Sequence, residues 1–308
     1  MTTTSTAEER IWTVLSHISA VTFGMGILLP VIGWSEQRQK SKYASFQCLQ
    51  ALGYQSLGFT VWLLTYLVLV VVVLLTLIGS SSGVPTTAGS IDPLFSSALT
   101  VVLILNFVLL ALYAILPVIA AVACALGRDF RYPILGNRLA GYLKHDSSNE
   151  DPLSEDHEFR WVAGMGHFSV IIALWGMLVP LAAWLTQGKQ SLFLKFQSIQ
   201  TLIFHAVALL LFFVAVFIYL FGAILVFASM GLIESQFSAS SSMIILILFG
   251  AISLIAVLIF FTIPLLHILG QWAGYRVLKG EDYRYPLIGR LVDGWISKPA
   301  PNPPGETS

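Results

Sequence analysis

Apolar residues fall into six long stretches that contain no Asp, Glu, Lys or Arg. A helix needs about 20 apolar residues to cross the hydrocarbon core of a bilayer, and each stretch is longer than that. Backbone amides in lipid must pair within their own segment, and no alternating barrel pattern is visible, so the stretches predict helices. The predicted fold class is an all-α integral membrane protein with six hydrophobic helical segments. The stretches are Ile11–Trp34, Phe46–Gly79, Leu94–Gly127, Trp161–Leu185, Phe196–Ala228 and Met243–Trp272.

The six segments form two tandem repeats of three. Residues 10–52 align with residues 160–202 without a gap, at a spacing of 150, and thirteen aligned pairs are identical. Shared hydrophobicity explains a few leucine matches, but it does not explain matched polar and helix-breaking residues, so we infer an internal duplication. The identical pairs are Arg10/Arg160, His17/His167, Ser19/Ser169, Gly26/Gly176, Leu28/Leu178, Pro30/Pro180, Trp34/Trp184, Gln37/Gln187, Ser41/Ser191, Phe46/Phe196, Gln47/Gln197, Gln50/Gln200 and Leu52/Leu202.

A short motif follows the third segment of each repeat. Residues 129–133 read Asp-Phe-Arg-Tyr-Pro, and residues 282–286 read Asp-Tyr-Arg-Tyr-Pro, at a spacing of 153. Apolar and basic residues alternate after each proline, which predicts an amphipathic helix in the headgroup plane, where Arg and Tyr are typical anchors. The chain therefore divides into a first membrane repeat (9–144), an acidic linker (145–157), a second membrane repeat (158–297) and a Pro-rich tail that we expect to be disordered (298–308).

Positive residues leave two topologies open, because cytoplasmic loops carry the excess of Lys and Arg. If all six segments cross, the repeats are inverted, as in some transporters, and the 16 Lys and Arg divide evenly between the two faces. If the first segment of each repeat re-enters on the same face, the far loops 80–93 and 229–242 contain none of them. We favour re-entry, because helix-breaking residues fall in both first segments. They are Gly24, Gly26, Pro30, Gly164, Gly166, Gly176 and Pro180.

Composition narrows the class of function. Charged residues make up 10% of the 308, and 16 positive residues balance 16 negative ones, so no nucleic-acid partner is expected. Cys48 and Cys124 both lie in apolar segments, as buried hydrophobic residues do. The sequence contains none of the common hydrolase, metalloprotease or phosphate-loop motifs, and no closely spaced carboxylates within a segment. We expect no enzymatic activity, cofactor or metal.

The motifs resemble those of a known family. They comprise His-x-Ser near the start of a first segment, Pro and Trp at its end, Phe-Gln-x-x-Gln opening the second segment, and acidic-aromatic-Arg-Tyr-Pro after the third. Together they are similar to the small bacterial membrane domain of unknown function grouped with the Tic-twenty-like proteins, named after a subunit of the chloroplast inner-envelope translocon. The resemblance covers Glu9–Tyr142 and Glu158–Ile296 and departs from the family pattern by carrying two copies. It implies a bacterial plasma membrane, and the positive residues then place most Lys- and Arg-bearing loops in the cytoplasm.

Polar residues in or beside the apolar segments are the candidate functional positions, since lipid makes them costly. Arg10 and His17 lie seven residues apart, near one helical face. They form either a polar stripe lining a cavity or hydrogen bonds to a neighbouring segment. Gln47 and Gln50 either coordinate a substrate or hold helices together. The structural reading is favoured in both cases. The candidates are Arg10, His17, Gln47, Gln50, Arg131, Tyr132, Arg160, His167, Gln197, Gln200, Arg284 and Tyr285.

Two functions remain. The favoured one is a non-enzymatic scaffold or assembly partner, which contacts the lipid bilayer and other membrane proteins. The alternative is a passive channel, transporter or protein-translocation component with a polar path between the repeats. A channel requires both Arg/His pairs to face one water-filled cleft, whereas a scaffold requires them to be buried or at the headgroups.

Overall fold

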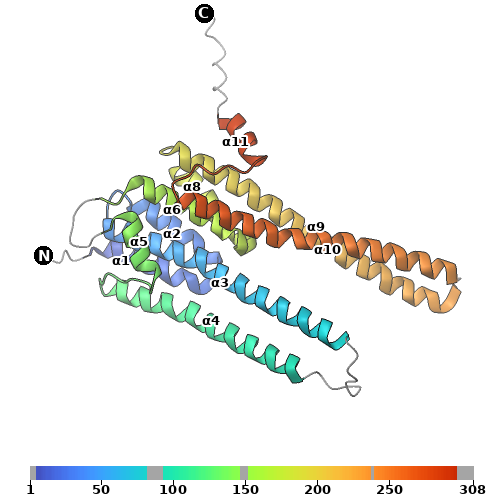
Figure 1. Ribbon diagram of the computed structural model, residues 1–308. Coiled ribbons are helices and arrows are strands. Elements are labelled where there is room, and N and C mark those ends of the chain that lie inside the picture. Colours follow the sequence, from blue (N-terminus) through green and yellow to red (C-terminus); the bar gives the residue numbers. More distant parts are fainter. Residues whose placement is uncertain (1–4, 82–92, 146–151, 237–238, 297–308) are drawn as a thin grey trace, which may run out of the picture.

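The computed structural model describes residues 5–81, 93–145, 152–236 and 239–296, and every regular element in these ranges is a helix (Figure 1). The predicted tail and residues 146–151 of the predicted linker lie outside the described residues. The first repeat contains α1 (Ala7–Ile18), η1 (Ser19–Thr22), η2 (Met25–Ile27), α2 (Leu28–Gln37), α3 (Lys42–Ser81), α4 (Pro93–Ala125) and α5 (Leu135–Leu143). The second contains α6 (Glu155–Phe168), η3 (Ser169–Ile172), α7 (Ala173–Gly176), α8 (Leu178–Gln187), α9 (Leu192–Gln236), α10 (Ala239–Leu278) and α11 (Ile288–Ile296).

Both repeats arrange their helices in the same way. The two short helices of the first segment pack on the start of a long helix, which pairs with the long helix that follows it. The long pairs, α3 with α4 and α9 with α10, extend from a shared body of short helices toward the same side of the molecule (Figure 1). The repeats are therefore parallel in the structure.

Three helices among the described residues are long and apolar enough to cross a membrane: Leu99–Ala125, Leu192–Leu225 and Ile247–Leu278. Their apolar side chains face outward, with Phe107 and Phe217 both 68% exposed. Large apolar surfaces of this kind require lipid around them, so the chain is an integral membrane protein. α3 is 40 residues long. Over much of its outer part, the structure describes the backbone alone.

The first segment of each repeat is broken, as the helix-breaking residues predict. In the first repeat the chain turns at Phe23 and Gly24, where φ is 48° and 94°. In the second repeat, Glu155–Gly176 and Leu178–Gln187 meet at an angle of 112°. Phe23 is 43% exposed at the turn, so the turn presents an apolar side chain outward.

Close backbone contact explains why a serine and a glycine recur at these breaks. A Cβ at Gly26 would overlap the carbonyl oxygen of Ser19, and a Cβ at Gly176 would overlap that of Ser169. The Ser169 hydroxyl also donates to the carbonyl oxygen of Gly176 (2.9 Å). Each glycine therefore allows the chain to fold back against its own first half.

Two of the residues that we counted as helix breakers do not break the helix. Gly164 and Gly166 lie inside α6, which runs unbroken to Phe168. Gly164 instead lets α10 approach, because a Cβ at Gly164 would lie 3.0 Å from the Leu278 side chain and 3.4 Å from the Gly274 carbonyl oxygen. At this position glycine serves packing between helices, the use that small residues have in membrane bundles.

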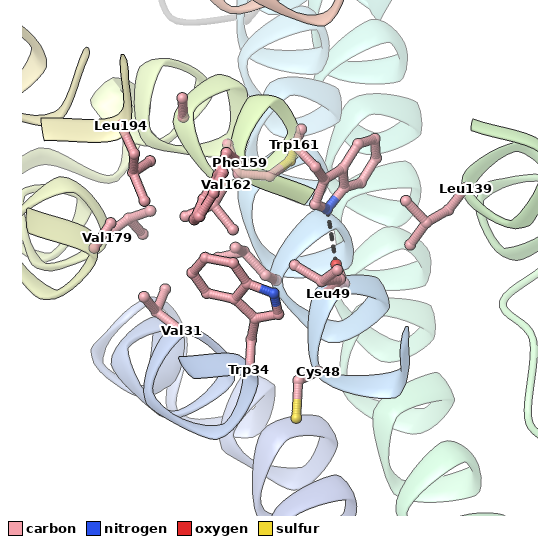
Figure 2. Close-up of a cluster of buried hydrophobic side chains, with 14 of the residues drawn as sticks. Val31, Trp34, Cys48, Leu49, Leu139, Phe159, Trp161, Val162, Val179 and Leu194 are labelled. Carbon is pink, nitrogen blue, oxygen red and sulfur yellow. Dashed lines mark hydrogen bonds between the residues drawn. The ribbon is translucent and has the colours of Figure 1, made fainter. Parts of the chain in front are cut away.

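The core of the body is shared by both repeats (Figure 2). Trp34 of α2 and Leu49 of α3 pack with Val162 of α6, and all three are fully buried. The helix predicted in the headgroup plane of the first repeat also joins this core: Leu139 and Leu143 of α5 are fully buried. The apolar face of α5 is thus covered by protein, because α3 and α6 pack against it.

Candidate functional site

Four candidate residues of the first repeat, His17, Gln47, Gln50 and Tyr132, meet in one group with Asp129, and we call this group the first polar cluster. α1 supplies the histidine, and α3 supplies both glutamines. They lie three residues apart and so on one helical face. The motif after α4 supplies Asp129 and Tyr132. His17, Gln47 and Gln50 are 0% exposed, whereas the Asp129 side chain is 29% exposed. The histidine and both glutamines are thus closed to solvent and lipid, and the aspartate lies at the outer edge of the cluster.

Hydrogen bonds connect every member of the first polar cluster. His17 Nδ1 lies 3.0 Å from Tyr132 Oη, and His17 Nε2 lies 3.0 Å from Gln47 Oε1. Gln47 Nε2 donates to Asp129 Oδ1 (2.8 Å) and to the Phe130 carbonyl oxygen (2.9 Å). Gln50 Oε1 accepts from the Tyr132 backbone N–H (2.8 Å). The motif after α4 is thereby fixed to α1 and α3.

The acceptors in this network determine where the protons lie. Gln47 Nε2 faces two oxygens, so its amide orientation is set, and Oε1 must accept. His17 Nε2, opposite that oxygen, therefore carries the ring proton, and Nδ1 accepts from the Tyr132 hydroxyl. Burial raises the pKa of Tyr132 well above its usual value of 10.0, which keeps this hydroxyl a donor. The cluster is satisfied with a neutral imidazole.

The second polar cluster repeats the first: His167, Gln197, Gln200, Asp282 and Tyr285. His167 Nδ1 lies 3.0 Å from Tyr285 Oη, and Nε2 lies 3.0 Å from Gln197 Oε1. Gln197 Nε2 donates to Asp282 Oδ1 (2.8 Å), and the Tyr285 backbone N–H donates to Gln200 Oε1 (3.3 Å). Burial also raises the pKa of Tyr285 well above 10.0. The same five residue types therefore make the same network in both repeats, with a buried histidine and an aspartate at the exposed edge.

A buried ion pair joins the two repeats. The Arg38 side chain is 1% exposed, and its Nη2 lies 2.8 Å from Glu155 Oε1 and 3.8 Å from Glu158 Oε2. Glu158, which is 4% exposed, also accepts from Ser45 Oγ (2.8 Å) and Trp34 Nε1 (3.2 Å). Breaking one side of such a pair leaves an uncompensated buried charge. The contact therefore fixes how α6 lies on α2 and α3.

One protein-family model matches residues 8–139 and, a second time, residues 158–292. The chain belongs to the magnetosome magnetite crystal formation protein family. Each matched region contains one complete polar cluster, and the double match supports the internal repeat. No curated protein and no solved structure matches this member of the family. The resemblance to the Tic-twenty-like proteins stays a prediction.

The four candidate arginines of this family member lie outside the two clusters. Arg10 Nε donates to Ser5 Oγ (3.0 Å), and Arg160 Nε donates to Asp156 Oδ2 (2.8 Å). Arg10 thus bonds near the start of α1, whereas His17 bonds to α3 and to the motif after α4. The polar stripe of these two residues was the less favoured of the two alternatives.

The other two arginines support the aspartates of the clusters from outside. Arg131 Nη2 lies 3.4 Å from Asp129 Oδ2, and Arg284 Nη2 lies 3.0 Å from Asp282 Oδ2. Arg284 also pairs with Asp293 of α11. Since each aspartate accepts from a glutamine with its other oxygen, the arginine and glutamine hold it between them.

Sequence reasoning missed Asp129 and Asp282 as members of the site. Both stood in the recurring motif, and their recurrence with Gln47 and Gln197 was the signal that could have identified them. Gly136 was missed as well: a Cβ there would overlap Gln50 Oε1. Among the described residues, no group of three or more His, Cys, Asp or Glu side chains is arranged to hold a metal ion.

Proposed function

We propose that the chain is a non-enzymatic membrane scaffold, which holds surfaces in fixed positions for other membrane proteins. The observation that carries the proposal is the complete burial of the histidine in each polar cluster. His17 and His167 are 0% exposed, and both ring nitrogens of each face a tyrosine or a glutamine. A polar path between the repeats would need these groups to face water. Here they hold each repeat together instead.

The family description supplies the setting of this proposal. It refers to magnetite crystal formation in magnetosomes, and we extend that setting to this chain. Its part there would be to organise proteins of the crystal-forming membrane. The partners we propose are the lipid bilayer and other membrane proteins, with no nucleic acid.

We also propose that four helices span the membrane and that both first segments re-enter. The parallel direction of the two long pairs supports this topology (Figure 1), as do the broken first segments and the exposed apolar turn at Phe23. The loops between the long helices would then lie on one face. All 16 Lys and Arg would lie on the other, cytoplasmic face of a bacterial membrane.

Vesicle permeability separates the scaffold from the channel. Purified protein is incorporated into lipid vesicles that enclose a self-quenching dye, and potassium flux is measured in parallel. We expect both signals to match those of vesicles without protein. Flux that rises with protein content, and that changes when His17→Ala and His167→Ala are introduced, would support the alternative function instead.

A loss experiment tests the scaffold directly. In a magnetite-forming host that encodes this chain, its deletion should remove particular proteins from the crystal-bearing membrane while their transcripts stay constant. Restoring the chain should return them. An unchanged membrane proteome would refute the scaffold.

Labelling from outside intact cells tests the topology. Ser240→Cys should react with an impermeant maleimide, whereas Lys189→Cys should react only after the cells are opened. Lys189 is exposed in the structure and is therefore a better probe than the neighbouring Gln187, which is 4% exposed and bonded to Arg38. External labelling of Lys189→Cys would contradict re-entry.

A further inference from the structure

The joint between the two repeats pairs unlike surfaces. α6 packs on α3 and α5 of the first repeat, with Trp161 at the centre of the contact (Figure 2). The Trp161 indole donates to the Leu49 carbonyl oxygen (2.9 Å) and lies 5.9 Å from the Tyr142 ring of α5. Within its own repeat α6 packs on α8, α9 and α10, as its counterpart α1 packs on α2, α3 and α4. The contact with α3 and α5 is therefore made by a further face of α6, and α1 has no helix among the described residues on the corresponding face. One surface of each kind therefore remains at the two ends of the molecule.

The first free surface, which we call the α1 end, comprises Glu8, Glu9 and Ile11. Ile11 aligns with Trp161 and is 58% exposed, although Trp161 itself is 6% exposed in the joint. Glu8 aligns with Glu158, and its side chain is 60% exposed. The residues that face the first repeat in α6 thus have exposed counterparts in α1.

The second free surface, which we call the α11 end, comprises the half-buried Lys195 and Ile203 of α9 and the exposed Leu291 and Trp295 of α11. α11 packs on α9, and its outer residues Leu291 and Trp295 are 56% and 60% exposed. Trp295 aligns with Tyr142, which meets α6 in the joint. The surface that receives α6 in the first repeat therefore has an exposed apolar counterpart in the second.

Charges at the two ends are complementary. In the joint, Glu158 Oε1 accepts from Ser45 Oγ (2.8 Å). At the aligned positions the α1 end has Glu8 and the α11 end has Lys195. Within its own chain Glu8 accepts from Gln37 Nε2 (2.9 Å) and lies 3.4 Å from Lys40 Nζ, but its side chain stays 60% exposed and so open to a second cation. If the ends met as the repeats meet, a carboxylate would face an ammonium group where the joint has a carboxylate and a hydroxyl.

The sizes of the side chains also change together. Trp161 fits against α3 because residue 53 is glycine, where an added Cβ would lie 2.5 Å from the indole. At the two ends the aligned residues are Ile11 and Ile203. A smaller side chain on one surface thus accompanies a larger one on the other, as a matching fit between the two ends would require.

We propose that copies of the chain associate head to tail in the membrane, with the α1 end of one copy on the α11 end of the next. The contact would repeat the joint between α6 and the first repeat. Because the two surfaces differ, each added copy leaves one free end, and association continues into a row or closes into a ring. The inference goes beyond the scaffold function and does not depend on it.

Disulfide crosslinking between two differently tagged chains tests the pairing. One chain carries Glu8→Cys and the other Lys195→Cys, and both are incorporated into the same vesicles and oxidised. We expect a mixed dimer, and a ladder of larger species when one chain carries both cysteines. The native cysteines are buried, so the wild-type chain is the blank. Lys279→Cys, at the exposed end of α10, is the matched control and should not crosslink to Glu8→Cys.

Two outcomes would overturn the proposal. Equal yields from Glu8→Cys alone and Lys195→Cys alone would show that like surfaces meet. Absence of any crosslink, together with quenching of Trp295 by brominated lipid, would show that α11 lies among the headgroups. If the ends do meet, Glu8→Lys should lower the yield of an Ile11→Cys with Ile203→Cys crosslink by about two- to fivefold. Adding Lys195→Glu to the receiving chain should restore it.

Discussion

Replacing Gln47 by methionine tests whether the first polar cluster holds the repeat together. The side chain keeps its length and loses its polar atoms. Gln47 accepts from His17 and Gln50, and it donates to Asp129 and the Phe130 carbonyl. A hydrogen bond of this kind contributes about 0.6–1 kcal/mol net. Loss of all four should lower the free energy of unfolding by about 2.5–4 kcal/mol.

Reversible unfolding in mixed micelles, followed by tryptophan fluorescence, measures this difference. Gln197→Met should have a similar effect, because the second cluster has the same bonds. Gln39 is exposed, so Gln39→Met should change the free energy by less than about 0.5 kcal/mol. Trypsin should also cleave faster at Arg138 in Gln47→Met, since the motif before α5 is released. If Gln47→Met behaves like Gln39→Met in both assays, the cluster does not stabilise the repeat.

Three further predictions follow from the described contacts. Gly26→Ala and Gly176→Ala should each lower the unfolding midpoint strongly, because the added methyl overlaps a backbone oxygen. Gly141→Ala is the control, because no atom lies within 4 Å of the added carbon; it should be neutral or stabilising by up to about 1 kcal/mol. Equal unfolding midpoints for all three variants would contradict the close backbone contact at the breaks of the first segments. Arg38→Met should lower the free energy of unfolding by roughly 3–5 kcal/mol, because it leaves Glu158 buried without its cation. Adding Glu158→Gln should recover part of this loss in the same unfolding assay. No recovery would argue against a coupled pair. Tyr132 has a raised pKa in the folded chain, so its contribution to stability is complete below about pH 10 and is lost as the pH rises further. The free energy of unfolding, measured from pH 9 to 11, should therefore fall less steeply for Tyr132→Phe than for the wild-type chain. Parallel curves would refute a raised pKa at Tyr132.

The features that recur within each repeat could be predicted from the sequence. The break in the first segment was predicted from Gly24, Gly26 and Pro30; the turn lies at Gly24, and Pro30 lies in the first turn of α2, after the break. Hydrogen bonding of His17 to a neighbouring segment was the favoured reading. The break and the histidine hydrogen bond both depend on contacts within one repeat, so the duplicated sequence contains the signal for each of them twice. The matched pairs isolated positions where a change would disturb a local contact.

Contacts between the repeats could not be predicted in this way. Arg38 has glycine at the aligned position, Gly188, and Trp161 has Ile11, so neither appears as a matched pair. The burial of the α5 face by α6 is another case, since an amphipathic pattern does not distinguish a protein surface from a headgroup layer. These residues differ between the repeats, so the role of each one follows only from the side chains that it contacts in the structure.

The location of the two polar clusters also orders the assembly of the chain during synthesis. His17 lies 115 residues before Tyr132, and His167 lies 118 residues before Tyr285. Every bond that defines a cluster joins residues of one repeat. The first repeat therefore has all partners of its own cluster once residue 132 has been made, before α6 exists. Arg38 must wait for Glu158, so the joint forms later, as a docking step between two halves that are already closed.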